Sequence, residues 1–82
     1  MSAEMIKDLE NRLINLDKMF QEERAEQNLV KMRLIASRFN ELHSQLYLLM
    51  ILIGKEEQDE IWKKIRSKAQ SIRSTQHNSN KI

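Results

Sequence analysis

The side chains that could carry out acid–base or metal chemistry in this 82-residue chain are few and widely separated. Its two histidines, His43 and His77, lie 34 positions apart, and neither has partners at a metal-ligand spacing; there is no cysteine. His43 is flanked by apolar residues at helical spacing, so we interpret it as a partly exposed histidine beside an apolar seam. The sequence therefore predicts no catalytic residue, no metal ligand and no cofactor.

One cluster of acids stands out, formed by Glu56, Glu57, Asp59 and Glu60. Such a cluster could attract a cation, but calcium and magnesium sites need oxygens that converge from a loop. Acids at the start of a helix are favoured by its dipole, and we prefer that interpretation. A single glycine cannot build a phosphate-binding loop, and no hydrolase or metalloprotease motif occurs. We expect a protein that is not an enzyme.

Basic residues dominate the C-terminal part of the chain. Residues 1–54 hold seven bases and eight acids, whereas residues 55–82 hold seven bases and four acids, with no acid after Glu60. The candidate partner-binding residues are Lys63, Lys64, Arg66, Lys68 and Arg73. We expect the apolar side of this helix to dock on the core and its bases to face an acidic protein partner. Nucleic acid and an anionic membrane surface are the alternatives.

Helical periodicity runs through most of the chain, which has no proline and only one glycine. A first apolar seam recurs at alternating spacings of three and four, and a second one follows in a different frame. The first comprises Ile6, Leu9, Leu13, Leu16 and Phe20, and the second Met32, Ile35, Phe39, Leu42, Leu46, Leu49 and Ile53. These patterns predict an all-α fold.

The polar segment 21–28 (QEERAEQN) decides between two architectures. Its residues are good helix formers, so one long, bent helix is possible. Alternatively the helix stops near Glu23 and restarts near Asn28 as a cap, so that the two seams pack as a helical hairpin. The change of frame favours the hairpin.

Gly54 is the strongest stop signal, and we expect it to end the second helix in a left-handed conformation. The expected helices cover about 3–23, 28–53 and 56–73, in one domain of residues 1–73. Ile61, Ile65, Ala69 and Ile72 line one side of the last helix, with Trp62 at the edge of the stripe. Residues 74–82 have no periodicity and are expected to form a disordered polar tail.

The segment 46–53 (LYLLMILI) is apolar around the whole helix circumference, and a two-helix contact cannot cover it. We therefore expect a coiled-coil-like homo-oligomeric bundle, a dimer above all. The expected interface residues are Leu42, Leu46, Leu48, Leu49, Ile51, Leu52 and Ile53. This design resembles, in architecture alone, small homodimeric helical-hairpin proteins, including plasmid- and phage-type regulators.

The expected function is that of a small homodimeric helical regulator that binds another protein as an adaptor, chaperone or inhibitor. The alternatives are a nucleic-acid-binding regulator that uses the basic C-terminal helix and a peripheral membrane regulator that uses the Trp62 face. The N-terminus lacks the pattern of a secretory signal, and the longest apolar run, 46–53, is far shorter than a membrane span. We expect a cytoplasmic location.

Overall fold

Every regular element in the computed structural model, which describes residues 2–74, is helical. Helix α1 covers Ser2–Ala25, α2 covers Leu29–Leu49, the 3-10 turn η1 covers Met50–Leu52, and α3 covers Lys55–Lys68. One more helical turn follows at residues 71–74. The second and third helices are thus shorter than the ranges 28–53 and 56–73 expected from the sequence. The expected tail, apart from Ser74, and His77 lie outside the described residues.

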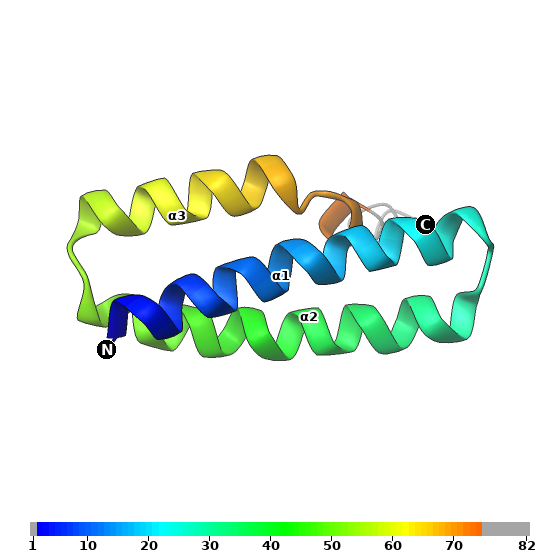
Figure 1. Ribbon diagram of the computed structural model, residues 1–82, viewed down its shortest axis with the longest axis horizontal. Helices are drawn as coiled ribbons and strands as arrows, with labels where there is room; N and C mark the ends of the chain where they lie inside the picture. The colour runs from blue at the N-terminus through cyan, green and yellow to red at the C-terminus, as the bar shows by residue number, and fades with distance from the viewer. Residues whose placement is uncertain (1, 75–82) are drawn as a thin grey trace.

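The chain reverses direction between α1 and α2, so the hairpin is the architecture found (Figure 1). Gln27 has a left-handed backbone (φ 58°) just after α1. The Asn28 amide donates to the Glu23 carbonyl at 2.9 Å and the Gln27 amide to the Arg24 carbonyl at 3.0 Å. This pair of bonds is the Schellman motif that satisfies the last carbonyls of a helix. Asn28 then caps α2, because its Oδ1 accepts the Lys31 amide at 3.2 Å.

The three helices form an elongated body with extents of 39 × 24 × 18 Å, and in the view of Figure 1 α1 is drawn between α2 and α3. Helix α1 runs antiparallel to α2, and α3 folds back along the pair. Helix α3 contacts α2 as well as α1, because the Trp62 ring lies 5.0 Å from the His43 ring. Among the described helices, none is long and apolar enough to cross a membrane.

The core draws side chains from all parts of the fold. The buried apolar residues are Ile6, Leu13 and Phe20 from α1, Phe39, Leu42, Leu46 and Met50 from α2 and η1, and Ile65, Ala69 and Ile72 from the C-terminal part. Each is at most 5 % exposed. The two seams therefore pack on each other, and α3 completes the core with its apolar stripe.

The connection between α2 and α3 differs from the expectation at Gly54. Its backbone is extended (φ −69°, ψ 157°) and caps the start of α3, so the left-handed conformation expected there is wrong. Helix α2 ends earlier, by tightening into η1 and then extending at Ile53. The side-chain amide of Gln58 donates to the Met50 carbonyl at 2.8 Å and to the Ile53 carbonyl at 3.1 Å. A side chain from α3, rather than a left-handed glycine, thus binds the carbonyls where η1 ends; that of Met50 also accepts the Ile53 amide at 3.2 Å.

Candidate interaction surfaces

Two buried acids on α1 hold the C-terminal part of the chain in place. Glu10, only 5 % exposed, forms an ion pair with Lys64 of α3, with 2.9 Å between Nζ and Oε1. Lys64 therefore serves the packing of α3 on α1, although the sequence suggested it as a partner-binding residue. Removing Lys64 should destabilise the protein, because it would leave the buried Glu10 side chain without its partner.

Asp17 makes the second connection, one heptad further along α1. Its side chain is fully buried, and Oδ1 accepts the backbone amide of Ile72 at 2.9 Å. The other oxygen, Oδ2, accepts the side-chain amide of Gln21 at 3.0 Å. Ile72 is near the start of the helical turn 71–74, where backbone amides have no partner within the turn. Asp17 thus acts as a cap supplied by a distant helix.

Sequence reasoning missed Glu10 and Asp17, although a signal was present. They lie seven residues apart and alternate with Ile6, Leu13 and Phe20 at spacings of three and four. Glu10 and Asp17 thus widen the first seam on the side that contacts Lys64 of α3 and Ile72. Charged side chains at stripe positions indicate buried polar partners across a helix pair.

Four aromatic side chains gather where α3 meets α2. The Trp62 ring lies 5.0 Å from the ring of His43 and 6.3 Å from that of Tyr47, and the rings of His43 and Phe39 lie 6.1 Å apart. Burial lowers the pKa of His43 from its usual 6.5, and the positive charge of Arg73 lowers it further. His43 is half-buried and packs against other rings, in agreement with its interpretation as a residue beside the seam.

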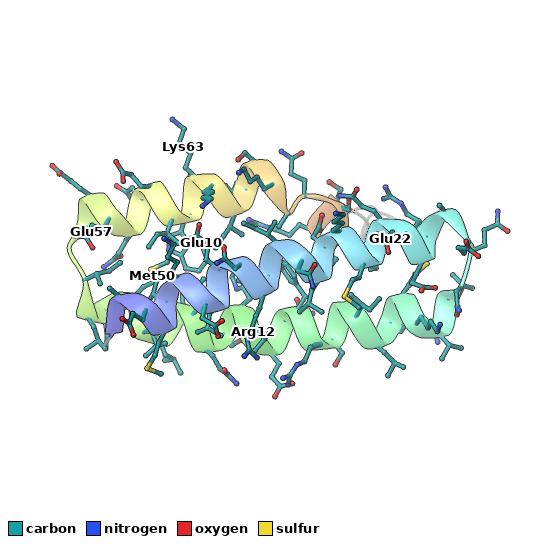
Figure 2. The ribbon with its side chains drawn as sticks, viewed as in Figure 1. Glu10, Arg12, Glu22, Met50, Glu57 and Lys63 are labelled. Carbon is teal, nitrogen blue, oxygen red and sulfur yellow. The ribbon has the colours of Figure 1, made fainter. Side chains whose placement is uncertain are left out.

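The remaining C-terminal bases face outward. Lys63, Arg66, Lys68 and Arg73 are all exposed, and Lys63 extends away from the bundle (Figure 2). Arg66 and Arg73 line a shallow hollow of about 210 Å³ together with Gln70 and Ser74. Two guanidinium groups with an amide and a hydroxyl can receive a carboxylate or a phosphate group.

The structure divides the residues that were expected to form an oligomer interface. Leu42 and Leu46 are buried in the core of their own chain, and Leu49 and Ile53 are half-buried against it. Leu48, Ile51 and Leu52 remain open, with 59 to 78 % of their surface exposed. Only these last three are fully available to a second molecule.

Exposed apolar side chains concentrate on α2 and η1. Besides Leu48, Ile51 and Leu52 they include Tyr47 at the same end and Leu29, Val30 and Leu34 at the hairpin end. On α1 only Met5 and Met19 are comparably exposed, and α3 has none. The outside of α2 is therefore the most apolar surface of the described chain.

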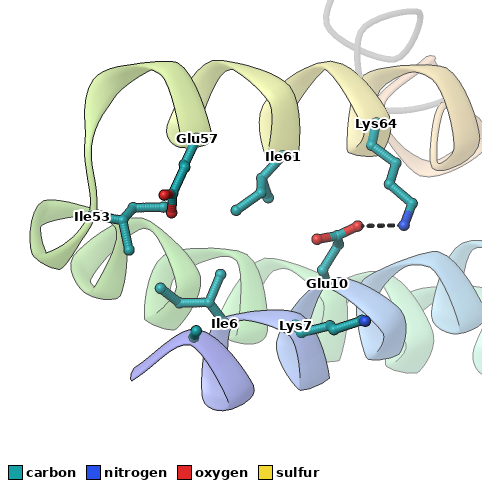
Figure 3. A pocket seen from close by; sticks show the side chains of 8 residues that line it. Ile6, Lys7, Glu10, Ile53, Glu57, Ile61 and Lys64 are labelled. Atoms are coloured by element: carbon teal, nitrogen blue, oxygen red, sulfur yellow. Dashed lines mark ion pairs between the residues drawn. The ribbon is translucent and has the colours of Figure 1, made fainter. Parts of the chain in front are cut away.

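A cavity of about 190 Å³ opens at the end of the bundle near Gly54 (Figure 3). Ile6, Ile53 and Ile61 form its apolar wall, and the Glu10–Lys64 ion pair lies on one side. Glu57 and Lys7 add further charges at its edge. Its polar groups include both acids and bases, so nothing in the cavity selects one sign of charge.

The acidic cluster begins α3, where Glu56 and Glu57 occupy the first turn. Within residues 2–74 no three histidine or acidic side chains come together in a way that could hold a metal ion. Neither a protein-family model, nor a characterised protein, nor a solved structure matches this chain. Functional inference therefore depends on the surfaces described above.

Proposed function

We propose that this chain is a non-enzymatic, cytoplasmic protein-interaction module, a small homodimeric helical regulator that acts by binding another protein. The observation that supports this proposal is the outside of α2 and η1, where Leu48, Ile51 and Leu52 are exposed beside a core that is closed without them. Monomeric soluble proteins rarely expose apolar patches of this kind without a partner to cover them.

The surface that we assign to the regulated partner is the basic side of α3. It comprises Lys63, Arg66, Lys68 and Arg73, while Lys64 contributes less because Glu10 already pairs with it. A partner with exposed aspartates and glutamates would be steered to this side and oriented by it. The apolar side of α3 is used by the core, so the contact with the partner is polar and depends on charge.

Affinity capture from the native cell tests this function. The tagged protein serves as bait, and the captured proteins are quantified by mass spectrometry after nuclease treatment. The triple variant Lys63→Glu/Arg66→Glu/Arg73→Glu should lose an acidic partner, because reversed charges repel it. The matched control reverses Lys7, Arg12 and Lys18, which are exposed on α1. Equal capture by wild type and triple variant would contradict the proposal.

A nucleic-acid-binding regulator is the second candidate, favoured by the hollow that Arg66 and Arg73 share. Phosphate contacts by these residues would make binding fall steeply as the salt concentration rises. A fluorescent oligonucleotide titrated at several salt concentrations tests this candidate. The membrane alternative has no such support, because the Trp62 ring packs against His43 and Tyr47 instead of facing solvent.

A further inference from the structure

The outside of α2 carries apolar residues at both ends and polar residues between them. Leu29, Val30 and Leu34 form the first apolar group, and Leu48 with Ile51 and Leu52 of the following turn η1 forms the second. All six are 59 to 78 % exposed. At 3.6 residues per turn, Val30, Leu34 and Leu48 project from nearly the same side, opposite the buried Phe39 and Leu46. We call this side the α2 outer face.

Four of the six apolar positions, Val30, Leu34, Leu48 and Leu52, are placed symmetrically along the chain. Position 41 is the midpoint of Val30 and Leu52, and it is also the midpoint of Leu34 and Leu48. Two copies of α2 laid antiparallel with Glu41 at the centre would therefore bring Val30 opposite Leu52 and Leu34 opposite Leu48. An interface with two-fold symmetry requires this kind of self-complementarity, in which one surface patch meets itself.

Charge along α2 favours the antiparallel arrangement over the parallel one. Residues 29–40 contain Lys31, Arg33 and Arg38 and no acid, whereas residues 41–52 contain one acid, Glu41, and neither lysine nor arginine. Parallel copies would place the basic halves side by side. Antiparallel copies place each basic half against residues 42–52, which hold no lysine or arginine and end near the acidic start of α3.

The centre of the face fits close contact between two helices. Ser37, Glu41 and Gln45 are exposed there, and Glu41 lies beside Arg38 of its own chain at 3.4 Å. Near the two-fold axis each Arg38 could bridge both Glu41 carboxylates, which offsets the repulsion between them. The register centred on Glu41 pairs four of these apolar residues, whereas sliding one helix by a turn would leave a single pair, Val30 with Leu48 or Leu34 with Leu52.

We propose that the α2 outer face is the dimer interface of this protein and that its occupant is a second copy of the chain, with the two α2 helices antiparallel and centred on Glu41. This inference rests on the homodimer in the proposed function and adds the surface, the orientation and the register. From Val30 to Leu52 the contact spans about 33 Å, at about 1.5 Å per residue, most of the 39 Å length of the molecule.

Sedimentation equilibrium with charge variants tests the register. Leu34→Lys and Leu48→Glu should each raise the dimer dissociation constant by at least about tenfold, because each buries a charge opposite a leucine. Both sites are exposed, so circular dichroism should show unchanged helicity. An equimolar mixture of the two variants should dimerise again, since the new lysine of one chain then faces the new glutamate of the other. Met5→Lys, on an exposed apolar residue of α1, is the matched control and should dimerise like the wild type.

A distance measurement tests the orientation. The chain has no cysteine, so Lys31→Cys provides a single site for a nitroxide spin label. Position 31 is ten residues from the centre, and antiparallel helices place the two labels about 30 Å apart along the axis. Parallel helices would place them within about 15 Å of each other, given interaxial distances of about 8–10 Å.

Three results would overturn the inference: a wild type that stays monomeric up to about 0.1 mM, a dimer that Leu34→Lys leaves intact, or a short distance between the labels. These tests of the dimer interface do not depend on the identity of the regulated partner. A monomer that still captures an acidic protein through Arg66 and Arg73 would refute this interface and leave the proposed protein binding supported. A dimer that captures no protein would refute the proposed protein binding and leave the interface supported.

Discussion

Asp17 is a charged side chain with no access to solvent, and its two oxygens are both occupied. One accepts the Ile72 amide and the other the amide of Gln21. Asp17→Leu should destabilise the protein by about 2 kcal/mol, because the buried Ile72 amide loses its acceptor. Chemical denaturation measures the loss. Asp17→Asn keeps an acceptor oxygen and should cost less.

The control for Asp17 is Asp8→Leu, which removes an exposed ion pair with Arg12. Exposed pairs contribute little, and the expected change is below about 1 kcal/mol. If Asp8→Leu and Asp17→Leu lose the same stability, the link between α1 and the turn 71–74 is not what holds the C-terminal part in place.

His43 makes the stability sensitive to mild acid. Burial and the nearby Arg73 lower its pKa in the folded state below 6.5, so the unfolded chain binds a proton at this residue more readily. Stability from this residue is complete above about pH 6.5 and falls as the pH drops from there to the lowered pKa. The melting temperature of the wild type should therefore fall more than that of His43→Gln between about pH 7.5 and 5.5.

A proton titration of His43 followed by NMR should give a pKa below 6.5, and Arg73→Gln should move it back toward that value. A His43 pKa above 6.5 would reverse the sign of the pH effect and contradict its packed position.

At the scale of the elements, the sequence showed where helices lie better than how they end. The alternating seams predicted the packed faces of α1 and α2, because burial imposes a period of about 3.6 residues on apolar positions. The single glycine misled the interpretation: Gly54 is extended, while Gln27 takes the left-handed conformation. Glutamine is uncommon in the left-handed conformation, so the residue type at position 27 did not indicate this backbone.

The termination of α1 at Gln27 leads to a stabilising substitution. A left-handed residue with a β-carbon costs about 1 kcal/mol or more, and glycine avoids this cost. Gln27→Gly should therefore raise the stability by about 0.5–1 kcal/mol, as measured by thermal or urea unfolding. Gln45→Gly, at an exposed site inside α2, is the control and should lower it by about 1 kcal/mol. A loss of stability in Gln27→Gly would mean that the turn does not have this backbone in solution.

The docking of α3 can be followed through Trp62, the only tryptophan. Its ring is half-buried between α3 and α2, against His43 and Tyr47. Its fluorescence should be shifted to the blue and partly protected from quenchers. Trp62→Ala should cost about 2 kcal/mol, less than the roughly 3–5 kcal/mol of a fully buried aromatic residue. Lys63→Glu, next to it but exposed, should cost almost nothing. A freely quenched spectrum would mean that α3 is not docked.

The whole molecule has a closed core and an open apolar face, and the sequence alone could not separate the two. Residues 46–53 are apolar on every side, so the pattern did not show which of them the chain itself buries. The structure assigns Leu46 and Met50 to the core and leaves Leu48, Ile51 and Leu52 outside. That division depends on where α1 and α3 pack, through contacts between residues far apart in the sequence, such as Glu10 with Lys64 and Asp17 with Ile72.

The open face predicts that stability depends on concentration. If two chains dissociate as they unfold, the melting temperature rises with protein concentration, because the associated state is favoured by mass action. With an unfolding enthalpy of about 0.7 kcal/mol per residue, a dimer of this chain should gain up to about 4 °C for each tenfold increase in concentration. Scanning calorimetry over a hundredfold range measures this shift. Leu34→Lys should melt at one temperature throughout, since its monomers retain the core and lose only the contact between copies. Superimposable wild-type curves over the same range would show instead that the exposed leucines do not contribute to stability through a second copy.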